Sequence, residues 1–408
     1  MSEAVIVSTA RSPIGRANKG SLVQMRPEVL TVQMLQAALA KVPELDPNTI
    51  DDLMLGCGQP AGESGNNLAR VVAVLAGLDP VPGTTVNRYC SSSLQTTRMA
   101  FHAIKAGEGH TFVSAGVETV SRYLNGYADG WPGVDVRSPE FADALARTDA
   151  RGAEGTEKWH DPREDSLLPD VYIQMGQTAE NVAQLTGISR REQDEFGVRS
   201  HNLAEKALAN GFWERDITPV TLPDGTVVSQ DDGPRPGTTY EKVAGLKPVF
   251  RPDGTVTAGN ACPLNDGAAA VVVMSDTRAR ELGLTPLARI VATGVTGLSP
   301  EIMGLGPIGA TRNALANAGL SIGDIDLVEI NEAFAVQVIG SARELGIPLD
   351  KVNVNGGAIA VGHPFGMTGA RITSTLINSL QFHDKQFGLE TMCVGGGQGM
   401  AMIIERLS

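Results

Sequence analysis

The sequence predicts an α/β fold in which one structural unit occurs twice. Short β-rich runs alternate with helical stretches along the chain, which is typical of helices that pack on a sheet. Three blocks of similar plan recur in the same order in both halves, about 270–280 residues apart. A segment rich in Gly, Pro, Asp and Arg separates the two halves. We therefore expect a duplicated α/β unit with a long insertion.

Each repeated block has the plan of one strand with its flanking segments. The first block combines a helix end, a polar loop, a buried strand and a polar tip. The second is a strand that ends in Asn, followed by a loop and a helix, and the third is a strand that runs into glycine. The pairs are residues 38–58 with 314–333, 84–104 with 352–377, and 110–118 with 389–398. Chance could produce one such match, but three in order indicate duplication.

The inserted segment contains two predicted helices. Residues 171–185 and 190–210 carry helical apolar spacing, and Ser189 with Glu192 forms a capping box before the second helix. Such an insertion suits a lid or a ligand platform, although it could instead serve only subunit contacts. The predicted units are 1–120 with 248–284 for the N-terminal half, 121–247 for the inserted loop domain, and 285–408 for the C-terminal half.

Length and composition agree with a globular protein of several domains. A chain of 408 residues is too long for one simple core, and 42% apolar with 19% charged residues is an ordinary globular composition. The net charge of −13 argues against nucleic acid or an anionic membrane as the main partner. A local basic patch could still bind a small anion. The longest apolar stretch is far shorter than the ~20 residues that a bilayer requires.

Cysteine usage and the N-terminus predict a cytoplasmic protein. Residues 4–7 already have the pattern of a strand, which leaves no room for an export signal before the fold. Four cysteines lie far apart, without the spacing of metal ligands. We therefore expect free thiols rather than disulfides, and no metal site.

Cys90 is the first candidate for chemistry. A β-rich start and a polar bend precede it, and a helix with apolar residues at 94, 99, 101 and 104 follows. At a helix N-terminus, the helix dipole and free N–H groups favour a thiolate. The alternative is a buried, inert cysteine, with the serines at 91–93 acting as ordinary helix caps.

His363 is the second candidate. Glycines on both sides let the backbone turn sharply around the imidazole, and Pro364 follows it. A histidine in such a loop suits a general base, and a core histidine is the alternative. Because its block is the counterpart of the Cys90 block, both residues should reach the same end of the two halves.

Cys393 and Asn331 complete the set. Cys393 precedes a glycine turn whose N–H groups, including that of Gly395, could bind an oxyanion; a buried strand cysteine is the alternative. Asn331 lies at a strand tip, where it could also be a plain helix cap. Ligands of α/β sheets gather at the carboxyl ends of strands. Two thiols, an imidazole and an amide that converge there predict covalent acyl chemistry with a proton shuttle.

At these residues the sequence resembles the thiolases, the acetyl-CoA C-acyltransferase family. The resemblance covers nearly the whole chain, through VIVSTARSPIG, TAGNACPLNDGAAAVVV, GLGPIGA, NEAF, GHPFGMTGAR and CVGGGQGMA. It implies two βαβαβαββ halves packed in αβαβα layers, with a large inserted loop domain. It also implies self-association as a homodimer or homotetramer.

The resemblance implies a role for each candidate residue. Cys90 would take up the acyl group as a thioester, and His363 would deprotonate Cys90 and help to bind the thioester oxygen. Cys393 would remove or return the proton on the carbon next to the thioester carbonyl. Asn331 would hold the water of one oxyanion hole, and the N–H groups of Cys90 and Gly395 would form the other.

The resemblance further implies that CoA binds largely through the inserted region, with its pantetheine arm reaching Cys90. The expected substrate contacts are Met175, Cys262, Met303 and Phe334. For both methionines, gap-filling in the core is the alternative.

The sequence departs from the family pattern near the site. Cys262 stands where many members have serine, Gln174 where short-chain biosynthetic members have histidine, and Ser93 where glycine is usual. Phe365 and Met367 replace smaller residues, and we expect them to reshape the acyl pocket. None of these departures affects the four catalytic candidates.

The predicted function is a thiolase of fatty acid and lipid metabolism, which converts 3-ketoacyl-CoA and CoA to acetyl-CoA and a shortened acyl-CoA, or catalyses the reverse Claisen condensation. CoA and acyl-CoA would be substrates, with no cofactor bound permanently. The alternatives are a condensing enzyme that uses malonyl thioesters and a catalytically silent CoA-binding protein. The second cysteine with NEAF argues against the former, and the intact set of four candidates argues against the latter.

Overall fold

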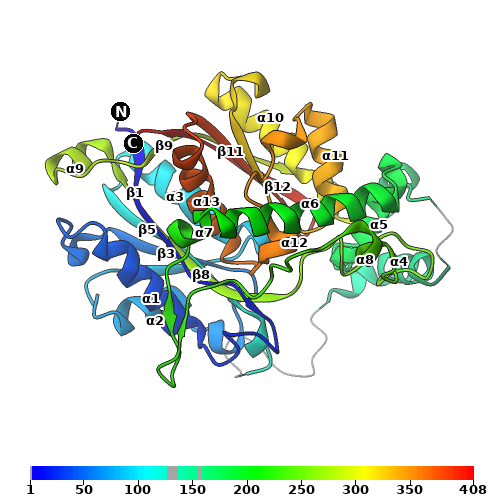
Figure 1. The fold of residues 1–408 in the computed structure, drawn as a ribbon, viewed down its shortest axis with the longest axis horizontal. Helices are drawn as coiled ribbons and strands as arrows, with labels where there is room; N and C mark the ends of the chain where they lie inside the picture. The colour runs from blue at the N-terminus through cyan, green and yellow to red at the C-terminus, as the bar shows by residue number, and fades with distance from the viewer. Residues whose placement is uncertain (1, 126–136, 155–157) are drawn as a thin grey trace.

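A mixed sheet of ten strands runs through the molecule (Figure 1). The computed structural model describes residues 2–125, 137–154 and 158–408. The strands are β1 Ala4–Arg11, β2 Gly15–Arg16, β3 Asp52–Cys57, β4 Gly83–Val86, β5 Thr111–Thr119, β8 Asn265–Ser275, β9 Ala288–Gly297, β10 Leu327–Ile330, β11 Phe387–Val394 and β12 Gln398–Arg406; β6 Val220–Thr221 and β7 Val227–Val228 pair separately. The strand order is β10-β11-β12-β9-β1-β8-β5-β3-β4, and β2 pairs with β8.

The sheet consists of two half-sheets with equivalent pairings. In the N-terminal half, β3 is parallel to β4 and β5, and the antiparallel strands β8 and β1 follow. In the C-terminal half, β10 is parallel to β11 and forms a parallel bridge from Val328 to Val352, and the antiparallel strands β12 and β9 follow. A short pairing between β1 and β9 joins the halves. The predicted duplication is therefore present in the strand order itself.

Helices cover both outer faces of the half-sheets and also separate them (Figure 1). The helices of the two halves are α1 Pro27–Ala40, α2 Leu68–Leu75, α3 Ser92–Ala106, α9 Asp276–Glu281, α10 Gly306–Ala318, α11 Ala335–Leu345, α12 Ala358–Val361 and α13 Thr368–Phe382. One apolar core joins α1 and α2 to the N-terminal half-sheet. A second surrounds α3 and α13 between the half-sheets, and a third lies under α10 and α11. The predicted αβαβα layers are thus observed.

Strand β8 shows why the sequence produces these layers. All of its residues are buried, as expected for a strand covered on both faces. Ala268, Ala270 and Val272 point into the core under α1 and α2, whereas Ala269 and Val271 point into the core around α3 and α13. Because side chains alternate along a strand, one apolar run contributes to two cores.

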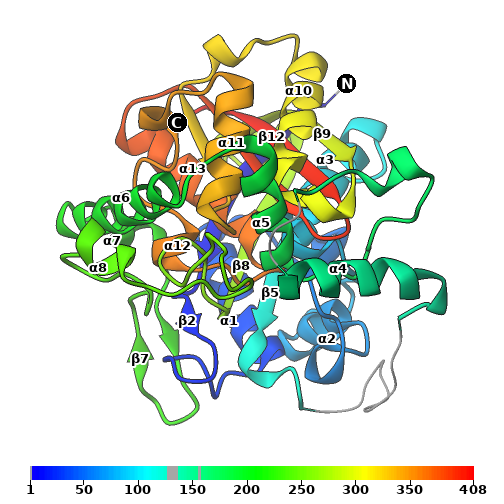
Figure 2. The same cartoon turned by 90° about the vertical axis from the view of Figure 1, so that its right-hand side faces the viewer.

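The inserted segment contributes α4 Ala142–Glu154, α5 Met175–Thr186, α6 Arg190–Ala209, α7 Phe212–Asp216 and α8 Tyr240–Ala244. The capping box of Ser189 and Glu192 is confirmed. The prediction that the earlier helix begins at residue 171 is wrong, because Asp170 accepts a hydrogen bond from the Tyr172 N–H and holds the backbone in a turn. Figure 2 shows α5 and α6 beside α11 of the C-terminal half. None of the described helices is long and apolar enough to cross a membrane.

Candidate active site

Cys90 lies in the short helical turn Tyr89–Ser91, directly before α3, and is 8% exposed. The preceding Tyr89 has a φ of 43°, which is rare for a residue other than glycine and marks a sharp turn into the helix. Burial raises the pKa of the Cys90 thiol to about 12, although the N–H groups of Gly395 and of Cys90 itself lower it. The N–H groups thus act in the direction expected at a helix N-terminus, but burial outweighs them and the pKa is raised overall.

His363 is buried in the loop before α13, and its hydrogen bonds define its tautomer. Thr368 Oγ1 lies 2.6 Å from His363 Nδ1 and donates its own hydrogen to the Pro364 carbonyl. The hydroxyl oxygen therefore accepts from Nδ1–H, which leaves the lone pair on Nε2. Asn331 Nδ2 donates to Nε2 at 3.2 Å. Burial, with a smaller contribution from Arg371, lowers the pKa of His363 to about 3, so the imidazole is neutral at pH 7.

Cys393 lies near the end of β11, fully buried, and its thiol donates to Gln337 Oε1 on α11 at 3.6 Å. Burial raises the pKa of Cys393 well above its usual value, and the neighbouring Cys90 and Cys262 raise it further. Three thiols therefore gather close enough to interact electrostatically. Gln337 was not predicted, and its only sequence signal is its place in the first turn of the helix after NEAF.

Glu118 is a second residue that sequence reasoning missed. It lies in β5, is fully buried, and accepts hydrogen bonds from the N–H groups of Gly58, Gln59 and Gly366 at 2.8, 3.2 and 2.8 Å. These bonds join the end of β3 to the loop that carries His363. A lone acidic residue in an otherwise buried strand was the only signal in the sequence.

A cavity of about 450 Å³ opens beside Cys90, and we name it the Cys90 cavity. Its lining residues are Gly58, Gln59, Tyr89, Cys90, Val171, Tyr172, Ile173, Met175, Phe365, Gly395 and Gly396. Met175 and Phe365 thus lie where the sequence placed them, in a wall near the nucleophile candidate. Gly395 also contributes the N–H that faces the Cys90 sulfur.

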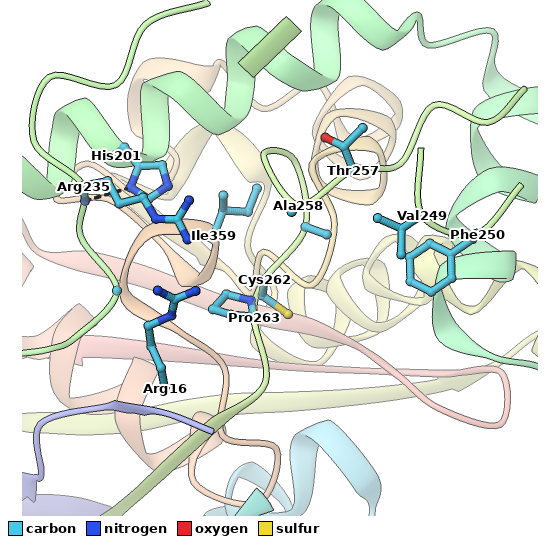
Figure 3. Close-up of a pocket in the computed structure, with 12 residues that line it drawn as sticks. Arg16, His201, Arg235, Val249, Phe250, Thr257, Ala258, Cys262, Pro263 and Ile359 are labelled. Atoms are coloured by element: carbon cyan, nitrogen blue, oxygen red, sulfur yellow. Dashed lines mark hydrogen bonds between the residues drawn. The ribbon is translucent and has the colours of Figure 1, made fainter. Parts of the chain in front are cut away.

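A separate cavity of about 210 Å³ contains Cys262, and we name it the Cys262 cavity (Figure 3). Arg16, His201 and Arg235 lie on one side of it, and Val249 and Phe250 on the other. Within the described part of the chain, neither the Arg16 nor the Arg235 guanidinium has a hydrogen-bond or ion-pair partner. Burial lowers the pKa of His201 to about 4, which leaves its imidazole neutral.

Some predicted site residues are packed in the cores instead. Met303 is 1% exposed and belongs to the third core, in agreement with the alternative that it fills a gap there. Phe334 belongs to the same core and packs edge-on against Phe250. The expectation that Met367 reshapes the acyl pocket is wrong, because its side chain is fully buried in the central core.

Two other departures from the family pattern have structural consequences. Ser93 accepts a hydrogen bond from the Ala370 N–H and so links α3 to α13. Gln174 precedes α5 and lines a different cavity from Cys90. Across the described residues, no group of three His, Cys, Asp or Glu side chains could hold a metal ion.

Between two equivalent α/β halves, Cys90, Cys393 and the Gly395 N–H lie near one another, and Phe365 joins the cavity beside Cys90 to the neutral imidazole of His363. This arrangement defines the class of cysteine-dependent acyltransferases. Family models agree: the thiolase N-terminal domain matches residues 4–277, and the thiolase C-terminal domain matches residues 284–406. The chain belongs to the thiolase family, as its motifs predicted.

Curated relatives and solved structures match over the full length. The 3-ketoacyl-CoA thiolase of Bacillus subtilis is 44% identical over 99% of this chain and 100% of its own. The 3-oxoadipyl-CoA/3-oxo-5,6-dehydrosuberyl-CoA thiolase of Escherichia coli is also 44% identical, over 100% of both chains. The Bacillus anthracis acetyl-CoA acetyltransferase structure superimposes with a TM-score of 0.86, at 41% identity over 100% of this chain and 99% of that one. The dimeric peroxisomal thiolase of Saccharomyces cerevisiae superimposes with a TM-score of 0.87. Its sequence identity is 35%, over 99% of this chain and 97% of that one.

Proposed function

We propose that this thiolase transfers an acyl group between 3-ketoacyl-CoA and CoA through a thioester on Cys90. The observation that carries the proposal is a buried, protonated thiol in the cavity whose Phe365 wall packs against a neutral imidazole, the Nε2 lone pair of which accepts only from the Asn331 amide among the described residues. A base of this kind is required because Cys90 is not a thiolate at rest. The same site serves cleavage and the reverse Claisen condensation.

In the cleavage direction, His363 Nε2 takes the proton of Cys90, and the thiolate attacks the 3-keto carbon. The bond between carbons 2 and 3 then breaks, so that the acyl group remains on Cys90 and the other fragment leaves as the enolate of acetyl-CoA. Cys393 supplies the proton that converts this enolate to acetyl-CoA. CoA next gives its thiol proton to the Cys393 thiolate and attacks the acyl thioester, and Cys90 regains its proton from His363.

Negative charge develops on carbonyl oxygens in each of these steps. The N–H groups of Cys90 and Gly395 face the sulfur and support one oxyanion hole. Asn331 donates to His363 Nε2, while its Oδ1 is buried without a partner among the described residues. An orphaned buried acceptor of this kind supports the proposal that Asn331 holds a water molecule for the second hole.

The Cys262 cavity has the chemistry that CoA needs. CoA carries phosphates at one end and a long, largely apolar arm that ends in a thiol. Arg16 and Arg235 offer two guanidinium groups without partners in the described chain, and Val249 and Phe250 offer an apolar wall. Cys262, which interacts electrostatically with Cys90, lies at the inner end of this route.

A second copy of the chain is the proposed partner. Strand β4 is the last in the sheet order, so its outer edge has no strand partner within the described residues. Val71, Val74 and Leu75 on the neighbouring helix α2 are exposed. Together they form a face suited to a homodimer. Light scattering of the wild type and of Val74→Asp would test this face. A wild-type dimer that becomes a monomer in the variant supports it, and an unchanged dimer rejects it.

The cytoplasmic location and the unit boundaries stay predictions.

The test of the reaction is CoA-dependent cleavage of acetoacetyl-CoA and of a long-chain 3-ketoacyl-CoA. Cleavage by the wild type that is lost in Cys90→Ala supports the proposal. Folded wild-type protein that cleaves neither substrate would overturn the proposal.

A further inference from the structure

The Cys90 cavity is larger than the chemistry at Cys90 requires. A methylene group has about the volume of a water molecule, roughly 30 Å³. The cavity measures about 450 Å³, so a tail of about eight carbons fills about half of it. An acetyl group alone would leave most of the cavity empty.

The lining of the Cys90 cavity carries no charged side chain among the described residues. Its inner part is built by Cys90, Ile173, Met175 and Phe365, and the thiol is protonated at neutral pH. Exposed polar groups occur at the rim, where Gln59 lies. The Cys262 cavity has the opposite character because it contains two guanidinium groups. The two cavities therefore suit the two ends of an acyl-CoA, the apolar one taking the acyl group.

Arg88, which precedes the lining residue Tyr89, does not itself line the Cys90 cavity and donates instead to Gln398 Oε1 at 2.7 Å. Glu118 holds the N–H groups of Gly58 and Gly366 on one side, so the group behind that wall is a carboxyl. Arg137 lines a neighbouring cavity, which Asp149 and Asp170 also line, so carboxylates accompany this cation. An acyl chain that ends in a carboxylate would thus lose its hydration without gaining a partner.

Phe365 is the side chain best placed to set the depth of the cavity. Its ring packs edge-on to the His363 ring, with 5.2 Å between centroids. The root of the side chain lies beside Gly58, where an added Cβ would come to 3.0 Å from the Phe365 Cβ. The ring therefore packs against the base candidate, and its Cβ lies beside the end of β3.

On the basis of the acyl transfer proposed above, we propose that the Cys90 cavity binds an uncharged, apolar acyl chain of medium length, and that Phe365 determines its length. Carbons that extend beyond the rim contribute little. Acyl chains with a terminal carboxylate are excluded because the lining offers no cation. This proposal separates the two kinds of substrate that the names of equally similar relatives contain.

The test compares kcat/KM for cleavage of acetoacetyl-, 3-ketohexanoyl-, 3-ketodecanoyl- and 3-ketoadipyl-CoA by the wild type. Each added methylene that is buried should raise kcat/KM by up to about fourfold until the rim is reached. The kcat/KM for 3-ketoadipyl-CoA should be on the order of 100-fold lower than that for 3-ketohexanoyl-CoA, which has the same number of acyl carbons.

Three variants locate the effect. Phe365→Leu should raise the ratio of kcat/KM for 3-ketodecanoyl- to acetoacetyl-CoA by at least about threefold, because the wall recedes. Gln59→Arg places a cation at the rim and should raise the ratio for 3-ketoadipyl- to 3-ketohexanoyl-CoA by about tenfold. Gln59→Met is its matched, uncharged control and should leave that ratio low.

The outcomes separate the two proposals. If no member of the series is cleaved by folded protein, the proposed function fails and the acyl subsite fails with it. Cleavage with equal kcat/KM for 3-ketoadipyl-CoA and 3-ketohexanoyl-CoA would overturn the acyl subsite alone. So would kcat/KM values that do not depend on chain length. Chain-length ratios that do not change in Phe365→Leu would overturn the assignment of this residue.

Discussion

Removal of the Thr368 hydroxyl should impair catalysis without any change to the reacting groups themselves. The variant is Thr368→Val, which keeps the shape of the side chain. In the wild type, Thr368 Oγ1 accepts from His363 Nδ1–H at 2.6 Å and so reserves Nε2 for proton transfer. Without it, Nδ1–H is buried without a partner, at a cost of about 1–3 kcal/mol. The imidazole then prefers the other tautomer or another orientation, and kcat/KM should fall by about 5- to 160-fold.

The assay is the rate at which acetyl-CoA acetylates Cys90 in a single turnover, together with acetoacetyl-CoA cleavage. Thr368→Ser retains a hydroxyl and should recover most of the lost rate, whereas a purely structural defect would not distinguish hydroxyl from methyl. Thr186→Val is a matched control, because it removes a hydroxyl that donates within α5. A Thr368→Val protein that acetylates Cys90 within twofold of the wild-type rate would refute the tautomer argument.

Three further predictions follow from the same geometry. In Cys393→Ala, acetyl-CoA should still acetylate Cys90, but the rate of acetoacetyl-CoA cleavage by the same protein should fall by about 10²- to 10⁴-fold. An equal loss of acetylation and of cleavage would contradict separate roles for the two cysteines. His363 stays neutral in the folded state down to pH about 3, whereas the unfolded chain takes up a proton below pH about 6.5. The free energy of unfolding, measured by urea titration, should therefore decrease by up to about 1.4 kcal/mol per pH unit as the pH falls from about 6.5 towards 3. A free energy of unfolding that does not change with pH in this range would contradict the burial of a neutral imidazole. Ser93→Ala leaves the Ala370 N–H without its acceptor and should lower the free energy of unfolding by about 1–3 kcal/mol, and an unchanged thermal midpoint would argue against this link.

The fold was predictable because its signals are local or repeated. The alternation of side chains in β8 is visible in the sequence, and the three repeated blocks coincide with β3 and β10, with β4, α3 and α13, and with β5 and β11. The positions of Cys90, His363 and Cys393 could be predicted for the same reason, since each lies at a strand end or loop with its own glycine or helix pattern.

The electrostatics and the supporting contacts could not be predicted, because they depend on residues far apart in the chain. Glu118 reaches the Gly366 N–H across 248 positions, and Gln337 meets Cys393 across 56. The helix dipole at Cys90 is a local effect that favours the thiolate, but burial by distant segments reverses the direction of the pKa shift. Met367 lies two residues from Phe365 yet points into the central core, which only the path of the backbone decides.

In the proposed reaction Cys90 carries the acyl group and Cys393 does not. The most direct test is mass spectrometry of the two cysteine-containing peptides after the enzyme is mixed with acetyl-CoA and quenched in acid. We expect one acetyl group on the Cys90 peptide, none on the Cys393 peptide, and loss of the label when free CoA is added before the quench. An acetyl group on the Cys393 peptide, or no label on folded and binding-competent protein, would contradict this assignment.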